Sequence, residues 1–118
     1  MRAIITAASA LFIAFAAITA QAHALLERAQ PRVGSTVASP PSQVTLYFSQ
    51  RLEPSLSSIT VTNASGQRVD AGRTSVSGST MSVPLRSIGV GTYRVTWRAL
   101  SVDTHTTEGS FAFTVGGR

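Results

Sequence analysis

The stretch Gly91–Leu100, GTYRVTWRAL, alternates apolar and polar side chains along its whole length. Successive side chains of an extended chain point to opposite faces, so this period of two predicts a strand with one buried face. That buried face consists of Tyr93, Val95, Trp97 and Ala99. We expect Trp97 to anchor a core, because large aromatic side chains contribute mainly through burial. The opposite face carries Arg94 and Arg98 and should be solvated.

The same period recurs in shorter stretches on both sides, such as QVTLYFS, SSITVTN and GSFAFTV, and helical periodicity is absent. Turn-type residues, mostly Gly, Pro, Ser and Asn, separate these stretches. Short strands with turn signals about every 8–12 residues are typical of a β-sandwich or small barrel. We therefore predict an all-β domain with about seven strands, at residues 24–29, 43–49, 57–63, 67–71, 79–84, 91–101 and 108–115.

The N-terminal stretch has the features of a cleaved export signal. Arg2 precedes an uninterrupted apolar run, and Ala20 and Ala22 form the small-x-small pattern that signal peptidase accepts. A membrane anchor is the competing interpretation, since an apolar run of about 18 residues can just span a bilayer. The run is rich in alanine and no positively charged stop follows it, which favours cleavage after Ala22. We therefore expect a signal peptide (1–22) and one soluble domain (23–118).

Composition excludes several classes of function. The chain has no cysteine, which rules out disulfides, thiolate-bound zinc, iron–sulfur clusters and thiol catalysis. Its formal net charge is +5, but the arginines are scattered, whereas nucleic-acid binding calls for a clustered basic patch. No GxSxG or P-loop motif is present, and Glu53, Asp70 and Glu108 are isolated in sequence. We therefore expect neither nucleic-acid binding nor hydrolytic catalysis.

The segment SVDTHTTEGSF, from Ser101 to Phe111, contains two metal-ligating side chains, Asp103 and His105. If the segment is extended, both project from one face with Cα atoms about 6–7 Å apart. They then point in the same direction rather than at each other, which argues against a catalytic triad. A carboxylate oxygen and an imidazole nitrogen at this spacing can converge on one ion. A polar loop with an incidental D-x-H pair is the alternative, because so short a match is common by chance.

His23 strengthens the metal interpretation. Cleavage after Ala22 frees the α-amine of His23, which can bind an ion together with its own ring Nδ1 in a six-membered chelate. With Asp103 and His105, the donors are three nitrogens and one oxygen, a set that suits the tetragonal preference of Cu(II). Zn(II) or Ni(II) could occupy the same donors more weakly. Met81 is the only methionine outside the predicted leader, so no thioether-rich Cu(I) site is evident.

Three pieces of the chain cover nearly all of residues 23–115: HALLERAQPRVGSTV, VTLYFSQRLEPSLSSITVTNASGQRV and GTYRVTWRALSVDTHTTEGSFAFTV. They resemble the small periplasmic copper-binding proteins of the CopC type. The resemblance implies an immunoglobulin-like Greek-key β-sandwich that holds one Cu(II) through His23, Asp103 and His105. It also implies copper resistance or homeostasis in the periplasm, with copper sequestered or delivered to an inner-membrane copper-transport protein. We expect a monomer whose mature chain does not insert into the membrane.

Two departures from that family bear on the site. Some relatives carry Glu where this chain has Gln50, which we do not expect to be a ligand. Others carry a loop rich in Met and His for Cu(I), so the single Met81 favours one Cu(II) site.

Two alternative functions remain: a copper-dependent oxidative enzyme with a histidine-brace site, and a metal-free immunoglobulin-like interaction module. In the enzyme, Asp103 would occupy an equatorial position needed for oxygen chemistry.

Overall fold

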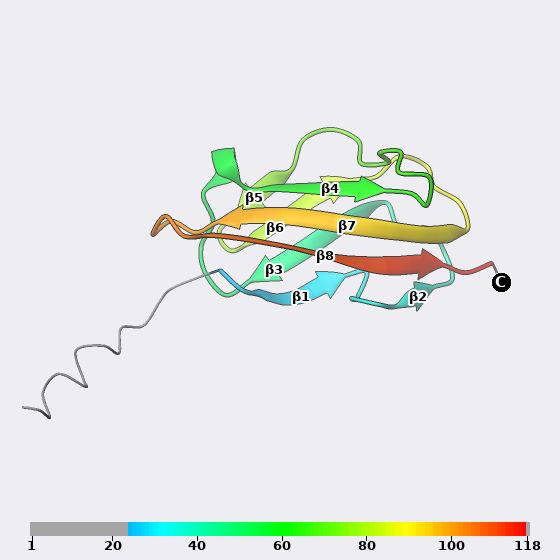
Figure 1. Cartoon of the computed structure of the whole chain (residues 1–118), viewed down its shortest axis with the longest axis horizontal. Coiled ribbons are helices and arrows are strands. Elements are labelled where there is room, and N and C mark those ends of the chain that lie inside the picture. Colours follow the sequence, from blue (N-terminus) through cyan, green and yellow to red (C-terminus); the bar gives the residue numbers. More distant parts are fainter. Residues whose placement is uncertain (1–23, 118) are drawn as a thin grey trace, which may run out of the picture.

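The computed structural model describes residues 24–117, which form two four-stranded β-sheets packed face to face (Figure 1). The sheets have the strand orders β1-β3-β6-β5 and β2-β8-β7-β4. Their strands are β1 (Leu26–Gln30), β2 (Thr36–Val37), β3 (Gln43–Phe48), β4 (Ser58–Thr62), β5 (Ser75–Ser77), β6 (Thr80–Pro84), β7 (Gly91–Leu100) and β8 (Thr106–Val115). A 3-10 helix, η2 (Pro54–Leu56), precedes β4.

Most connections between the strands pass from one sheet to the other. The two exceptions are the hairpins β5–β6 and β7–β8, whose strands are neighbours in one sheet. Such crossing connections are characteristic of Greek-key sandwiches. The predicted all-β, immunoglobulin-like sandwich is therefore confirmed.

The core lies between the two sheets and consists of alternate residues of the longer strands. Their period of two matches the expected inward faces: Val44, Leu46 and Phe48; Ile59 and Val61; Tyr93, Val95, Trp97 and Ala99; Phe111, Phe113 and Val115. Met81 from β6 is also 0% exposed in this core. The rings of Tyr93 and Phe113 stack with centroids 5.5 Å apart.

Trp97 is the core anchor that the sequence predicts. It is 9% exposed and meets Phe48 edge-on, with ring centroids 5.1 Å apart. Its cross-strand partner on β8 is Gly109. A Cβ atom at position 109 would lie 2.5 Å from Cζ2 of the indole. The indole therefore fills the space that any side chain at position 109 would need.

The predicted strand at residues 67–71 is wrong. This segment crosses between the sheets and touches each of them at one isolated bridge, Thr62 with Arg68 and Asp70 with Leu85. A single bridge to each sheet cannot extend into a ladder. Conversely, β2 and β5 fall outside the predicted strands, because two or three residues are too few to show a period. The described chain has eight strands rather than about seven.

The connection between β4 and β5 also satisfies backbone groups on the open edge of β4. The carboxylate of Asp70, 4% exposed, accepts the N–H of Val61 at 2.9 Å. Thr74 Oγ1 accepts the N–H of Ile59 at 3.0 Å. Burial raises the pKa of Asp70, but the hydrogen bonds from Arg68 and Val61 outweigh burial, so the pKa lies below its usual value. Paired edge groups of this kind keep β4 from recruiting another strand.

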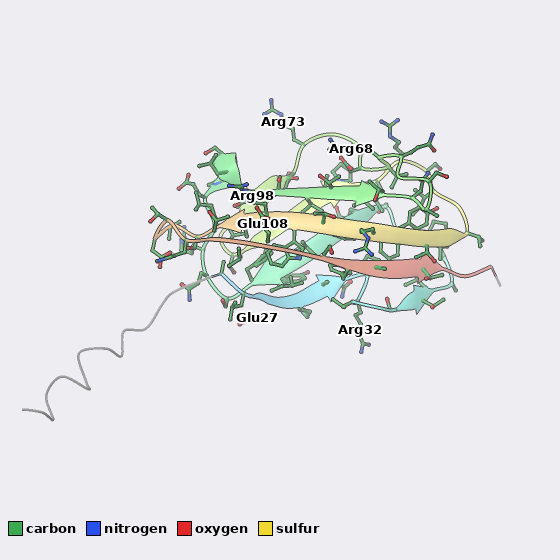
Figure 2. The ribbon with its side chains drawn as sticks, in the orientation of Figure 1. Glu27, Arg32, Arg68, Arg73, Arg98 and Glu108 are labelled. Atoms are coloured by element: carbon green, nitrogen blue, oxygen red, sulfur yellow. The ribbon has the colours of Figure 1, made fainter. Side chains whose placement is uncertain are left out.

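The charged surface shows no clustering of the arginines. Figure 2 shows Arg32, Arg68, Arg73 and Arg98 leaving the sandwich at different places. Arg98 pairs with Glu108 at 3.3 Å across β7 and β8, and both side chains are more than half exposed. The outer face of β7 is thus solvated, as predicted. Across residues 24–117, no helix is long and apolar enough to cross a membrane.

Gly109→Ala should destabilise the domain, because the added methyl group would overlap the indole of Trp97. We expect the free energy of unfolding to fall by about 1–3 kcal/mol, the usual cost of overpacking a core. Urea unfolding followed by tryptophan fluorescence measures this loss. Gly89→Ala is the matched control, since no atom lies within 4 Å of a Cβ built there. Equal stability of the two variants would contradict the described packing.

Asp70→Asn should lower the free energy of unfolding near neutral pH, because the amide cannot form an ion pair with Arg68. A carboxyl whose pKa is depressed by folding stabilises the fold above its unfolded pKa, about 3.9. That contribution disappears as the pH falls through the folded pKa. The difference in the free energy of unfolding between parent and variant should therefore be largest at about pH 7. It should shrink as the pH falls below about 4. Chemical denaturation over this range measures it, and a constant difference would disprove the role of the charge.

Candidate metal centre

The turn between β7 and β8 carries two of the three predicted ligands, Asp103 and His105. The strands pair as far as Leu100 and Thr106, and residues 101–105 reverse the chain at one end of the sandwich (Figure 1). Thr104, at the point of reversal, has a φ of 74°, a left-handed conformation that β-branched residues rarely adopt. The Thr104 hydroxyl donates a hydrogen bond to the carbonyl of Asp103.

This turn contradicts the expected extended conformation of the D-x-H segment. In an extended chain, the side chains of Asp103 and His105 would be parallel. With Thr104 left-handed, they point at each other instead, and His105 Nδ1 lies 3.4 Å from Asp103 Oδ1. The side chain of His105 is 42% exposed and that of Asp103 is 41% exposed, so an ion can reach both from solvent.

Ser101 forms hydrogen bonds to both of these residues. It is 1% exposed, and its hydroxyl donates a hydrogen bond to Asp103 Oδ1. Its backbone N–H donates to the carbonyl of His105 at 2.9 Å. The hydrogen bond from Ser101 is the main cause that lowers the pKa of Asp103; His105 acts in the same direction, and partial desolvation opposes both. Asp103 is therefore a carboxylate at neutral pH, the form that binds cations.

The first described residues of the chain are fixed beside this turn. Ala24 is 0% exposed, and its carbonyl accepts a hydrogen bond from Thr107 Oγ1 at 2.7 Å. The N–H of Leu25 donates to Ser49 Oγ at 2.9 Å, and its carbonyl accepts the N–H of Ser49 at 2.9 Å. Figure 1 accordingly shows the beginning of β1 and the β7–β8 turn at the same end of the sandwich.

The third predicted ligand, His23, and the predicted signal peptide, residues 1–22, lie outside the described residues. Between Ala24 and Gly117, no three His, Asp or Glu side chains are grouped closely enough to hold a metal ion. Asp103 and His105 alone are thus too few donors to complete a metal centre. A carboxylate and an imidazole suit Cu(II) or Zn(II) better than soft Cu(I). The thioether of Met81 is enclosed in the core and is not available at this surface.

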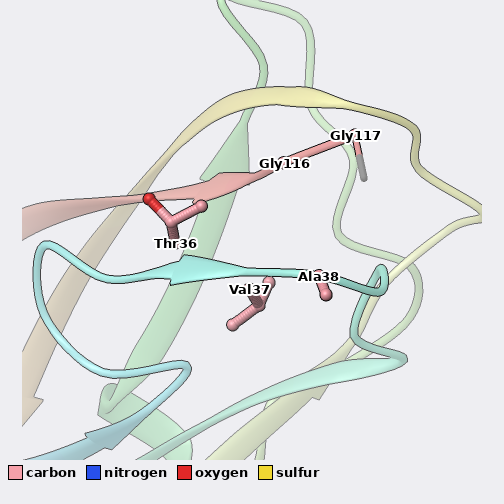
Figure 3. Close-up of a pocket in the computed structure, with 5 residues that line it drawn as sticks. All are labelled: Thr36, Val37, Ala38, Gly116 and Gly117. Atoms are coloured by element: carbon pink, nitrogen blue, oxygen red, sulfur yellow. The ribbon is translucent and has the colours of Figure 1, made fainter.

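Other features of the described chain do not add ligands to this pair. Gln50 is exposed, directly after Ser49. A shallow pocket lies where β2 meets the end of β8 (Figure 3), and its lining has no acidic or imidazole group: Thr36, Val37, Ala38, Gly116 and Gly117. It offers an apolar surface rather than a metal site.

Three residues around the turn have roles that sequence reasoning missed. Ser49, Ser101 and Thr107 act through hydroxyl groups, and isolated Ser and Thr residues are common throughout this chain. Only Ser101 had a local signal, since it lies two residues before Asp103. The contacts of Ser49 and Thr107 join residues 24 and 83 positions apart. No short motif can reveal such pairs.

Residues 26–116 match the family model of the CopC domain. Copper resistance protein C of Escherichia coli is 33% identical over 126 residues, which cover 97% of this chain and 95% of that protein. Copper transport protein CutJ of Bacillus subtilis is 33% identical over 110 residues and matches 90% of this chain. The chain spans only 20% of the length of CutJ, which is a much longer protein.

Two solved structures share the fold. CopC from Methylosinus trichosporium OB3b has a TM-score of 0.76 and 31% identity, covering 81% of this chain and 96% of that one. PcoC from Escherichia coli, described as a methionine-rich copper resistance protein, has a TM-score of 0.71 and 34% identity, covering 80% of this chain and 99% of that one. Sequence and fold therefore agree over almost the whole described domain, and the chain belongs to the CopC domain family.

Proposed function

We propose that this protein is a periplasmic Cu(II)-binding protein for copper resistance or homeostasis, which holds one Cu(II) per chain and sequesters or delivers it. One observation carries the proposal. Asp103 and His105 meet at 3.4 Å in a turn beside Ala24, the residue that follows His23. The names of the CopC-family relatives, which are copper resistance and copper transport proteins, support the same conclusion.

The proposed donors are the α-amine and Nδ1 of His23, a carboxylate oxygen of Asp103 and an imidazole nitrogen of His105. His23 directly precedes Ala24 in the sequence, and the Cα atoms of adjacent residues are about 3.8 Å apart across an ordinary trans peptide bond. The amine becomes a ligand only when the leader is cut after Ala22. Signal peptide removal and completion of the metal centre would then be the same event.

Copper in the divalent state is the cargo that best fits these donors. Nitrogen and carboxylate ligands favour Cu(II), which also leads the stability order of the divalent first-row metals, ahead of Zn(II) and Ni(II). A Cu(I) centre would require soft sulfur ligands. PcoC is described as methionine-rich, whereas this chain has Met1 in the predicted leader and Met81 in the core. We therefore propose one Cu(II) site and no second, Cu(I), site.

Binding and transfer, rather than catalysis, are the proposed activities. Asp103 at an equatorial position would occupy the place that oxygen needs in a histidine-brace enzyme. The related region of CutJ is one part of a longer copper transport protein. An inner-membrane copper-transport protein is the proposed recipient of the copper, and the mature protein is proposed to act as a soluble monomer.

One extra residue before His23 should abolish the amine–imidazole chelate and sharply weaken Cu(II) binding. The experiment compares protein beginning at His23 with protein beginning at Ala22, both verified by intact mass, in Cu(II) titrations. We expect one Cu(II) per chain for the first form, and an affinity lower by more than about 100-fold for the second, since even outer partners of metal ligands cost about 10–100-fold. Equal affinity would favour a different site, and no binding by either form would favour a metal-free interaction module.

His105→Ala should remove one nitrogen coupling from the Cu(II) EPR spectrum, and Asp103→Asn should shift the spectrum without removing a nitrogen. Both side chains are exposed, so neither change should unfold the domain. Glu108→Gln is the matched control, because this exposed carboxylate on β8 pairs with Arg98 instead. Spectra that stay unchanged in both turn variants would rule out the proposed ligands.

A further inference from the structure

The beginning of the described chain is held to the sandwich at four points. The side chain of Ala24 is 0% exposed in the core, and its carbonyl accepts the Thr107 hydroxyl at 2.7 Å. Leu25 donates its N–H to Ser49 Oγ and accepts the Ser49 N–H, both at 2.9 Å. Two of the four contacts depend on side-chain hydroxyl groups. Chain ends are usually mobile unless they are tied down in this way.

We propose that Thr107 and Ser49 are positioning residues that hold the new N-terminus of the mature chain next to Asp103 and His105. This inference rests on the proposed function, because it assigns a task to groups around the proposed Cu(II) site. Neither residue is a ligand in the proposal. Each acts on the peptide that connects His23 to the sandwich.

The geometry of β8 explains why Thr107 suits this task. Thr107 follows His105 by two residues and is the second residue of β8. The bond from Thr107 to the Ala24 carbonyl thus ties residue 24 to the same strand that begins after His105. One trans peptide bond, about 3.8 Å between Cα atoms, then leads back to His23. Ser49 fixes the next residue, Leu25, to the end of β3 and so limits rotation about the first contact.

The benefit of such a clamp is preorganisation. A free chain end would have to be ordered when copper binds, and this ordering would reduce the affinity. Residues 24 and 25 are already fixed by folding, so copper binding does not have to order them. The clamp should therefore affect metal binding more than it affects the stability of the domain, whose core retains Ala24.

The test uses protein that begins at His23 and carries Thr107→Val, Ser49→Ala or both changes. Valine keeps the branched shape of threonine and removes the hydroxyl. Thr114→Val is the matched control, because the Thr114 hydroxyl bonds to Thr92 at 3.2 Å at the other end of β8. Thr107→Ser restores the hydroxyl and should restore binding.

We expect Thr107→Val and Ser49→Ala each to weaken Cu(II) binding about tenfold, in the range known for outer partners of metal ligands. Their thermal stability should stay close to that of Thr114→Val. The Cu(II) EPR spectrum should broaden in the double variant, because a loosely held terminus samples several geometries. A purely structural role would leave the spectrum sharp. If Thr107→Val does not fold, the Cu(II) affinity of Ser49→Ala, which lacks a clamping hydroxyl group, is compared with that of Thr107→Ser, which keeps both.

Two negative results separate this inference from the proposed function. Parent-like affinity in both hydroxyl variants, combined with loss of binding when one residue precedes His23, would overturn only the positioning role. Binding that does not respond to the extra residue would overturn the proposed function and the positioning role with it. Full rescue by Thr107→Ser, together with an unaffected Thr114→Val, would support the clamp.

Discussion

The pairing of β7 with β8 is the constraint on which the core and the candidate metal centre both depend. The ladder runs without interruption from Gly91 and Val115 to Leu100 and Thr106. Within it, the indole of Trp97 lies over Gly109, the one residue type that leaves space for the ring. A slip of one residue would turn the outer face of the hairpin into the core, so packing enforces this register. Because the register is enforced, the turn at residues 101–105 has a defined place.

The turn uses this rigid support to present two donors in a strained but exposed arrangement. Thr104 in its left-handed conformation turns Asp103 and His105 toward each other, and the buried Ser101 holds the backbone and the carboxylate in place. Functional residues often lie in loops that a rigid sandwich positions. Here the loop donors also lie next to the beginning of β1, where Thr107 and Ser49 fix residues 24 and 25.

Within the CopC family, this chain differs from PcoC in its methionine content and from CutJ in its length. PcoC is described as methionine-rich, whereas Met81 of this chain fills the core between the sheets. The sandwich is thus retained, with a TM-score of 0.71, although this chain has only two methionines. CutJ carries a related region within a much longer protein, so the same sandwich occurs in proteins of different length.

The sequence by itself determined the buried faces of the strands, because a period of two is a local property of an extended chain. It also predicted Asp103 and His105 as candidate metal ligands at a short spacing. Only the tertiary structure decided that residues 67–71 cross between sheets, since that path depends on bridges to Thr62 and Leu85. Likewise, the direction of the Asp103 and His105 side chains depends on how the paired strands force the chain to reverse at Thr104. The hydroxyl contacts of Ser49 and Thr107 join distant positions, so no local pattern of residues could encode them.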